Sequence, residues 1–357
     1  MTPPERHYAM WMFTGACPSR CTYCDIASQQ GRSGLSTSEV ERVSREILEQ
    51  RFSEVLFVGG EPLLSADLPA ALAVLRGHIR TAVFTGGIPG FAEKAVKVLE
   101  GGAVDRVVFS IDSGDPAQND EIRGRKGITE ALLQMASLIK LRLPRMGRSL
   151  NTVVSRFNVD SLHGLWDRME PFGLESWALT LAGDSFGASP GHAFLDLDML
   201  ARLYFETIPS LAARTAKVGV ELVVLPVPYP LLAARIPPVR WGEIGKSRSR
   251  VEVLSELERS SRGEHNATFV RKHGCPLVGI DVVIGVSGEV HPCSQAPIID
   301  PRYVVGNIKS QSLGEVLSGD ALARFREGVP HAPCTRCWAP SNVPRDVLVK
   351  LLAKPKG

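Results

Sequence analysis

Three cysteines near the N-terminus have the spacing of a metal-cluster loop. Cys17, Cys21 and Cys24 follow the pattern C-x3-C-x2-C directly after the apolar run 8–13. Cysteine thiolates hold iron–sulfur clusters, and a [4Fe–4S] cluster takes four such ligands. Three ligands leave one iron open to bind a substrate or cofactor, as open positions do at other catalytic metal sites. The alternative is a zinc loop completed by His7, which precedes the apolar run and would lie at the wrong end of a strand.

Four further cysteines form a second group near the C-terminus. The runs 282–286 and 289–291 flank Ser287-Gly288 and predict a β-hairpin that delivers one of these cysteines. An amphipathic helix is predicted over 312–327, directly before a C-x2-C pair. Four thiolates make a closed site, which is structural or transfers electrons. The residues alone leave a zinc ribbon and an iron–sulfur cluster open as interpretations. The four ligands of this second group are Cys275, Cys293, Cys334 and Cys337.

Composition excludes several classes of function. The chain has 357 residues, of which 44% are hydrophobic, and its 41 basic and 38 acidic residues give a net charge of +3. This excess is too small to indicate a nucleic-acid partner. No apolar run approaches the roughly 20 residues that a membrane span needs. Residues 1–7 lack the apolar region of a signal peptide, so a cytoplasmic location is expected. In a reducing compartment, grouped cysteines favour metal ligation over disulfides.

Short β-rich runs alternate with stretches of helical length between residues 8 and 181. This alternation predicts βα units around a parallel sheet, with a first helix capped by Ser36 or Ser38. Ligand groups in such sheets gather at the carboxyl ends of the strands. The expected fold class is α/β, a partial (β/α)6 TIM-like barrel with a small C-terminal domain of a β-hairpin and a helix. The six predicted strands are 8–14, 54–58, 81–85, 106–112, 149–154 and 176–181.

A basic segment lies between the barrel and the second cysteine group. Residues 235–272 hold nine Lys or Arg against five Glu, an excess of +4. One interpretation is a solvated helix with Val251, Leu254 and Leu257 on its apolar face. The other is an anion-binding segment, and both remain open.

The cysteine triplet after a first strand and the Gly59-Gly60-Glu61 turn after a second resemble the radical S-adenosylmethionine (SAM) enzymes. The resemblance covers about residues 8–182. In that family the three cysteines hold a [4Fe–4S] cluster whose open iron binds the amino and carboxylate groups of SAM. The resemblance implies that Cys17, Cys21 and Cys24 are catalytic, and that the reduced cluster cleaves SAM to methionine and a 5′-deoxyadenosyl radical.

The resemblance also implies which residues bind SAM. The family places an aromatic residue of the cluster loop near the adenine and binds the amino group of SAM at the Gly-Gly-Glu turn. A further pattern, S-x-D…H-D-x-x-R-G, follows strand four, and here Asn119 stands in place of the usual His. Local packing for Tyr23 and local capping for Ser110 and Asp112 are the alternatives. The implied cofactor-binding residues are Tyr23, Gly59, Gly60, Glu61, Ser110, Asp112, Arg123 and Asn151.

The second cysteine group resembles the shortened auxiliary-cluster domain, called twitch, of radical SAM enzymes. The C-x2-C-x5-C segment of the full SPASM domain is missing. The implied cofactors are therefore two [4Fe–4S] clusters and SAM. The chain is predicted to divide into four segments. Residues 1–226 form a radical SAM barrel with a following helix (196–217) and strand (220–227), and residues 227–272 form a linker or lid with a basic helix. Residues 273–340 form the twitch domain, and residues 341–357 form a C-terminal helix or tail.

The single auxiliary cluster most resembles the aminocyclitol dehydrogenase branch. This resemblance implies an oxidoreductase or lyase of antibiotic biosynthesis. Its substrate would be a sugar, aminocyclitol or nucleoside, which it would dehydrogenate or decarboxylate. The expected partners are a small-molecule substrate and an external electron donor such as flavodoxin or ferredoxin, with no nucleic acid and no membrane. A start directly at the first strand favours a small molecule, because many peptide-modifying relatives carry a preceding recognition domain. Modification of a peptide or protein side chain is one alternative, and a non-catalytic zinc- or cluster-binding protein is the other.

Overall fold

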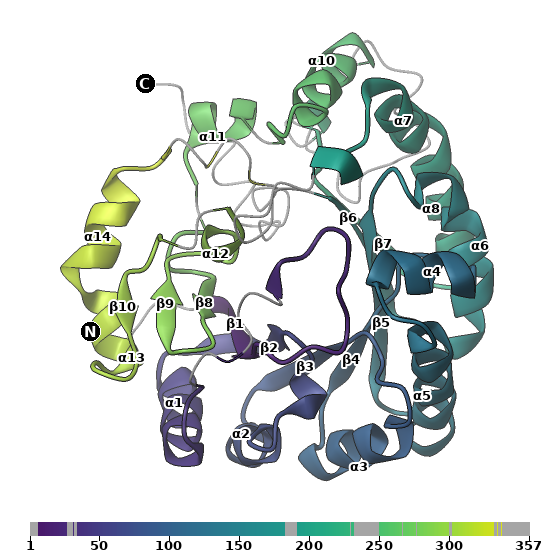
Figure 1. Ribbon diagram of the computed structural model, residues 1–357. Helices are drawn as coiled ribbons and strands as arrows, with labels where there is room; N and C mark the ends of the chain where they lie inside the picture. The colour runs from purple at the N-terminus through teal and green to yellow at the C-terminus, as the bar shows by residue number, and fades with distance from the viewer. Residues whose placement is uncertain are drawn as a thin grey trace.

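A single ten-stranded sheet organises the chain, with strand order β10-β9-β8-β1-β2-β3-β4-β5-β6-β7. In the computed structural model the sheet curves around a centre that faces the viewer in Figure 1, and helices cover its outside. The structure describes residues 6–26, 31, 34–182, 191–228, 230–231, 250–265, 267–275, 277–299, 302–331, 334 and 337.

The strands are β1 (Arg6–Thr14), β2 (Phe52–Gly59), β3 (Arg80–Thr85), β4 (Arg106–Ser110), β5 (Gly147–Val154), β6 (Ser176–Leu181), β7 (Glu221–Leu225), β8 (Val282–Ile284), β9 (Glu289–His291) and β10 (Gly306–Asn307). The α-helices are α1 (Thr37–Glu49), α2 (Leu68–Leu75), α3 (Ala92–Gly102), α4 (Pro116–Arg123), α5 (Ile128–Arg142), α6 (Leu162–Met169), α7 (Leu197–Arg202), α8 (Ile208–Lys217), α10 (Arg250–Ser260), α11 (Ala267–His273), α12 (Ala296–Ile299), α13 (Leu313–Ser318) and α14 (Asp320–Glu327). Short 3₁₀ turns lie at η2 (Pro62–Leu64), η3 (Val159–Ser161), η4 (Glu170–Phe172) and η5 (Gly191–Ala193), and η6 (Leu203–Thr207) is a π-helix.

Strands β1 to β7 pair in parallel and in sequence order. Their apolar residues are buried on both faces, as expected of parallel strands between a barrel interior and a helical layer. Tyr8, Leu56, Ala82 and Val108 form the inner cluster. The predicted α/β fold class is confirmed, and all six predicted strands are present. Strand β4 ends at Ser110, so Asp112 follows the strand and does not belong to it, contrary to the prediction.

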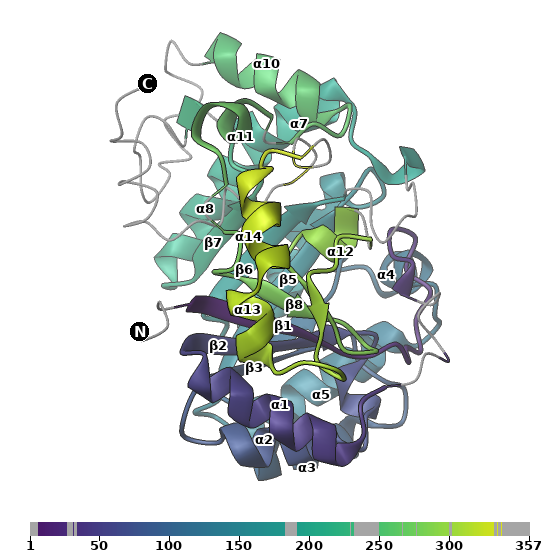
Figure 2. The same ribbon diagram turned by 90° about the vertical axis from the view of Figure 1, so that its left-hand side faces the viewer.

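The C-terminal hairpin continues the barrel sheet, which the sequence did not predict. Strand β8 pairs with β1 in parallel, with Ala9 opposite Val282 and Trp11 opposite Ile284. Pairing removes the exposed edge that β1 would otherwise present. Figure 2 shows α13 beside α1, where the backbone N–H of Leu313 donates to Glu46 over 2.7 Å. The second cysteine group is therefore built onto the first strand of the barrel.

Two predicted helices are interrupted. The helix predicted over 196–217 consists of α7, the π-helix η6 and α8, with a proline in the first turn of α8. Proline lacks the N–H that would continue an α-helical hydrogen bond, which accounts for the irregular turn before it. The helix predicted over 312–327 divides at Gly319, whose backbone is extended. The predicted cap of the first helix is confirmed, because Ser36 and Glu39 form a capping box on α1.

The basic helix α10 buries a face that agrees only in part with the predicted one. Its buried residues are Val253, Glu256, Leu257 and Ser260, whereas Val251 is 76% exposed. The prediction is right at Leu257, which is 1% exposed, and wrong at Val251, because the face that α10 buries is set by its contact with α7. Across the described segments, every helix is too short or too polar to span a bilayer.

Candidate active site

The loop after β1 carries the first three cysteines and is fixed by the end of α4. The backbone N–H groups of Arg20 and Thr22 donate to the carbonyls of Arg123 and Ile122, both over 2.9 Å. Gly124 ends α4 with φ of +62°, and a Cβ atom there would lie 2.3 Å from the Arg20 carbonyl oxygen. Only glycine satisfies both demands at this position. The middle of the cluster loop is therefore held in one place by the barrel.

The Gly59-Gly60-Glu61 turn supports the same loop from the other side. The N–H of Gly60 donates to Thr14 over 2.6 Å, and the N–H of Glu61 donates to Ala16 over 2.7 Å. A Cβ atom would lie 2.7 Å from the Thr14 oxygen at Gly59 and 2.1 Å from the Ala16 oxygen at Gly60. The resemblance implies that this turn binds the amino group of SAM. In the structure, the two glycines are required because the turn touches the backbone of the cluster loop.

Glu61 is buried and ties β2 to β3. Its Oε2 atom accepts hydrogen bonds from the Thr85 hydroxyl and the Gly86 N–H, both at 3.0 Å, and Oε1 accepts from the Leu63 N–H at 3.3 Å. Burial raises the pKa of Glu61 to about 7, although these hydrogen bonds act in the opposite direction. Thr85 and Gly86 were missed as site residues, although their place at the end of β3 was a usable signal.

A cavity of about 170 Å³ brings most of the predicted residues together. The cysteine loop, β2, β3, β4 and α4 all contribute to its wall. Of the predicted cofactor-binding residues, Asp112 and Asn151 are not among those that line it. A larger cavity of about 790 Å³ on the outer side of β1 shares only Cys17 with the predicted site. The predicted residues on the smaller cavity are Cys17, Cys21, Tyr23, Cys24, Gly59, Gly60, Glu61, Ser110 and Arg123.

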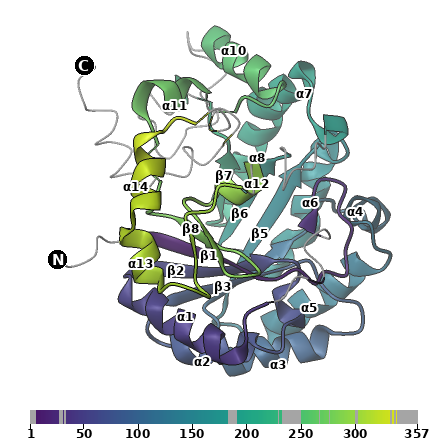
Figure 3. The same ribbon diagram turned by 60° about the vertical axis from the view of Figure 1, so that its left-hand side comes forward.

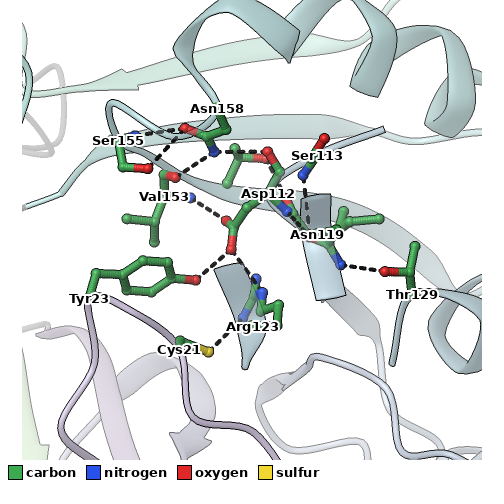
Figure 4. Close-up of polar contacts among 12 residues, drawn as sticks. Cys21, Tyr23, Asp112, Ser113, Asn119, Arg123, Thr129, Val153, Ser155 and Asn158 are labelled. Carbon is green, nitrogen blue, oxygen red and sulfur yellow. Dashed lines mark hydrogen bonds and ion pairs between the residues drawn. The ribbon is translucent and has the colours of Figure 1, made fainter. Parts of the chain in front are cut away.

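Arg123 is the charged centre of this cavity (Figure 4). Its Nε atom lies 2.8 Å from Asp112 Oδ2, and its Nη1 atom donates to the Cys21 sulfur over 3.8 Å. Its guanidinium lies 5.9 Å from the centre of the Tyr23 ring. Burial alone would lower the pKa of Arg123, but the Asp112 carboxylate, together with Tyr23 and Cys21, outweighs burial and raises the pKa above its usual value. The cavity therefore carries a permanent positive charge beside the cysteine sulfurs.

Asp112 is fully buried and organises the groups around it. Its Oδ2 atom accepts from the Tyr23 hydroxyl over 2.6 Å, and Oδ1 accepts from the Val153 N–H over 2.9 Å. Asn119 accepts from the Asp112 N–H over 2.8 Å and donates to Thr129 over 2.8 Å, as Figure 4 shows. Asn119, whose role the sequence left open, is therefore a buried support for the segment that follows β4.

Tyr23 and Asn151, two further predicted residues, differ in whether they line the cavity. Tyr23 is buried, lines the cavity and donates a hydrogen bond to Asp112. The same side chain therefore packs locally and faces the site, which were the two alternatives for it. Asn151 lies opposite Ser110 in the β4–β5 register, and its backbone carbonyl accepts from the Ile111 N–H over 3.2 Å. Asn151 is not among the described residues that line the cavity.

The second cysteine group gathers residues from three parts of the chain. Cys275 follows α11, Cys293 follows β9, and Cys334 and Cys337 follow α14. Burial raises the pKa of Cys293 to about 12, and the neighbouring Cys275 and Cys334 add to this effect. None of the seven cysteines is in a disulfide. In the part of the chain that is described, no three His, Cys, Asp or Glu form a group that could hold a metal ion. The metal assignment of both groups therefore rests on residue type and on related proteins.

His7 does not complete the first cysteine group. It lies at the start of β1, with its Nδ1 atom 3.2 Å from Asp281, whereas the cysteine loop follows the end of the same strand. The zinc alternative for the triplet thus lacks the ligand that the sequence offered for it.

Comparison with known proteins identifies two domains. Residues 11–163 match the model of the Radical SAM superfamily. Residues 275–338 match SPASM, an iron–sulfur cluster-binding domain. The chain carries a radical SAM domain followed by an iron–sulfur cluster domain. These domains imply a [4Fe–4S] cluster and SAM at the first site and additional iron–sulfur chemistry at the second.

The most informative sequence relative is a PqqA peptide cyclase from Xanthomonas campestris pv. campestris (strain B100). It is 29% identical over 168 residues, which cover 46% of this chain and 44% of that protein. The match thus spans less than half the length of the curated relative.

Two solved structures share the fold of this chain. SuiB from Streptococcus suis, bound to precursor peptide SuiA, has a TM-score of 0.67 at 16% identity over 97% of this chain and 71% of its own. Native anSMEcpe, with bound AdoMet and Cp18Cys peptide, has a TM-score of 0.63 at 16% identity over 94% of this chain and 87% of its own. At this level of identity the likeness concerns the fold alone.

Proposed function

We propose that this radical SAM enzyme modifies a side chain of a peptide or protein substrate. The observation that carries the radical chemistry is the cavity in which three cysteines, the Gly-Gly-Glu turn and a buried arginine meet. The peptide substrate is supported by the relatives, since a peptide cyclase matches the sequence and two peptide-bound enzymes share the fold. This was the alternative interpretation of the sequence, and it now takes precedence over the small-molecule substrate.

The residues present suit the implied cofactors. Cys17, Cys21 and Cys24 would hold the catalytic cluster, because all three residues line the cavity. When bound, the cluster and SAM supply a carbon radical able to remove hydrogen from an unactivated position. The Nη2 atom of Arg123 is buried without a hydrogen-bond partner among the described residues. An unpaired buried charged donor is costly, so a carboxylate in the cavity would complete its environment.

The other cavity residues have proposed roles that follow from their positions. Ser110 lies on the wall at the end of β4 and would contact the ribose or carboxylate of SAM. The Tyr23 ring would pack near the adenine, and the Gly59-Gly60-Glu61 turn would receive the amino group. Asp112 acts as a positioning residue, because its oxygens hold Arg123, Tyr23 and the β5 backbone. Asn151 remains a proposed SAM-side position beside Ser110.

The second cysteine group would hold one further [4Fe–4S] cluster, which makes two in the chain. Its four thiolates leave no open position, so its proposed role is to accept the electron that remains after hydrogen abstraction. The proposal includes an external one-electron donor such as flavodoxin or ferredoxin and a cytoplasmic location.

Transfer of an isotope label tests the substrate class. Peptides encoded beside the gene, and a panel of aminocyclitols, sugars and nucleosides, are supplied with deuterium on carbon to the reduced enzyme with SAM. Because the radical abstracts hydrogen directly, the label of the true substrate moves into 5′-deoxyadenosine, which mass spectrometry detects. Transfer from a peptide supports the proposal. Transfer from a small molecule, with none from any peptide, would replace it.

Oxidative tailoring of a sugar, aminocyclitol or nucleoside is the second candidate. The observation that favours it is the cysteine inventory, since the three and four residues of the two groups account for all seven cysteines in the chain. A single auxiliary site is the arrangement that resembles the aminocyclitol branch. In that case one ketone or decarboxylated product would form for each 5′-deoxyadenosine.

A further inference from the structure

The loop that follows β5 carries a buried asparagine, Asn158, which is 1% exposed and precedes η3 and α6. Its Oδ1 atom accepts from the Ser155 N–H over 2.7 Å. Its Nδ2 atom donates to the Val153 carbonyl over 2.9 Å and to the Asp112 carbonyl over 2.8 Å. Only one orientation of this amide fits, because its oxygen faces a backbone donor and its nitrogen faces two backbone acceptors. Asn158 thus joins the end of β5 to the segment that follows β4.

Asp112 is held by two asparagines, one from α4 and one from the loop after β5 (Figure 4). Its N–H donates to Asn119, and its carbonyl accepts from Asn158. The Val153 N–H donates to Asp112 Oδ1, while the Val153 carbonyl accepts from Asn158. These bonds close a ring of Asp112, Val153 and Asn158. The ring fixes the direction in which the Asp112 carboxylate points.

The Asp112 carboxylate carries this constraint to the cavity, because its Oδ2 atom lies 2.8 Å from Arg123 Nε. Asn158 itself is not among the described residues that line the cavity. The two parts of the chain are close, since a Cβ atom on Gly114, before α4, would lie 2.4 Å from the Gly164 carbonyl oxygen of α6. Figure 3 shows α4 beside α6, in agreement with Figure 1. The influence of Asn158 on the cavity therefore passes through Asp112.

We propose that Asn158 is a positioning residue for SAM, which holds Asp112 so that Arg123 presents its guanidinium to the carboxylate of SAM. The inference rests on the proposed role of Arg123 and adds a residue from the next βα unit. The Nη2 atom of Arg123 is buried without a hydrogen-bond partner among the described residues. It meets a ligand only while the guanidinium is held in that direction. A group that is oriented beforehand does not have to be ordered when the ligand binds.

The variants Asn158→Asp and Asn158→Ala test the role of the amide. The first keeps the shape but places an oxygen against two carbonyl oxygens, and the second removes the donor without adding a charge. In both, the affinity for SAM should fall about tenfold, since the backbone that fixes Asp112 loses its donor. Equilibrium binding of SAM to the anaerobically reconstituted protein measures this.

Iron content, and the rate of 5′-deoxyadenosine formation at saturating SAM, should stay near those of the wild type. The reason is that the cysteine loop is held by backbone contacts with α4 and with the Gly-Gly-Glu turn, none of which involves Asn158. A weaker affinity at an unchanged maximal rate is a split that lost stability alone would not produce.

A double-mutant cycle with Arg123→Lys shows whether Asn158 acts through the guanidinium. If it does, Asn158→Ala/Arg123→Lys should bind SAM about as weakly as Arg123→Lys alone. Two independent effects would instead multiply to about a hundredfold loss. The cycle is also measured with Asn158→Asp, so that it does not depend on the folding of one variant.

The matched control is Tyr204→Phe, which removes another buried hydrogen bond, from the Tyr204 hydroxyl to the Pro226 carbonyl, away from the cavity. Its affinity for SAM should equal that of the wild type. The inference is overturned if both Asn158 variants bind SAM normally, if their losses multiply with that of Arg123→Lys, or if Tyr204→Phe loses as much. Normal affinity in Arg123→Lys alone would overturn the proposed role of Arg123 as well, whereas the other outcomes leave that role intact.

Discussion

Arg123 connects the cysteine loop to the barrel through contacts that a lysine cannot reproduce. Its planar guanidinium reaches Asp112 and Cys21 through different nitrogens. Arg123→Lys retains the charge but loses the fork, so the affinity for SAM should fall about tenfold or more. Equilibrium binding of SAM to the anaerobically reconstituted protein measures this.

The control is Arg125→Lys, an exposed arginine that donates to the Pro18 carbonyl over 3.3 Å from outside the cavity. Its affinity for SAM should remain near that of the wild type. Equal losses in both variants would remove Arg123 from the proposed SAM site.

His265 should make stability depend on pH. Burial lowers its pKa from 6.5 to about 4 in the folded chain. As the pH falls, His265 therefore takes up a proton in the unfolded chain before it does so in the folded chain. Its contribution to the free energy of unfolding is complete above about pH 6.5 and is lost as the pH falls to about 4. The loss should reach about 3 kcal/mol over that window. Urea unfolding of the metal-free protein at several pH values measures it.

His265→Gln removes the titrating group and should flatten the pH dependence in that window. The exposed His78, replaced in the same way, should leave the wild-type slope unchanged. An unchanged slope in His265→Gln would show that other groups cause the acid sensitivity.

At the scale of elements, the Gly-Gly-Glu turn and the cysteine loop act as one unit. Gly60→Ala would place a Cβ atom 2.1 Å from the Ala16 oxygen, which is a backbone contact that no side-chain rotation relieves. The turn or the loop must then move, and roughly half of the iron should be lost because the triplet can no longer hold its cluster. Iron analysis after anaerobic reconstitution measures the loss.

Gly101→Ala on α3 is the matched control, because nothing lies within 4 Å of the added carbon. It should retain full iron and equal or higher stability. Full iron in Gly60→Ala would mean that the turn and the loop are not coupled.

The strands and the cysteine loop could be predicted because their signals are local. Apolar runs and glycine turns specify a βα unit within a few dozen residues. The pairing of β8 with β1 joins residues far apart in the chain, and no local pattern encodes it. The structural role of Asn119 could not be predicted either, because a sequence does not show whether an asparagine side chain is buried or exposed. Val251 was misplaced since the face that α10 buries depends on where α7 lies.

At the scale of the whole molecule, two cluster sites should be separable. The reconstituted enzyme should hold about eight irons, four at each site. Replacement of Cys17, Cys21 and Cys24 by Ala should remove about half of the iron and abolish formation of 5′-deoxyadenosine. Iron and zinc analyses, together with mass spectrometry of the nucleoside product, measure both effects.

Replacement of Cys293 by Ala is the reciprocal variant, and it should reduce the iron while formation of 5′-deoxyadenosine without substrate continues. Tight zinc with only four irons would reassign the second group to a zinc ribbon. Absence of iron from the wild type would overturn both cluster assignments.

The pairing of β8 with β1 also bears on how the chain matures. The strand that leads into the cysteine triplet emerges from the ribosome well before its second neighbour, Val282–Ile284, which follows the seven parallel strands of the barrel in the chain. Contacts this distant in sequence form late, because a long loop must close first. Until then Trp11 and its strand present an open edge that other chains can join. Iron delivered after synthesis is complete would meet a finished loop, whereas iron delivered earlier would meet cysteines on an unpaired strand.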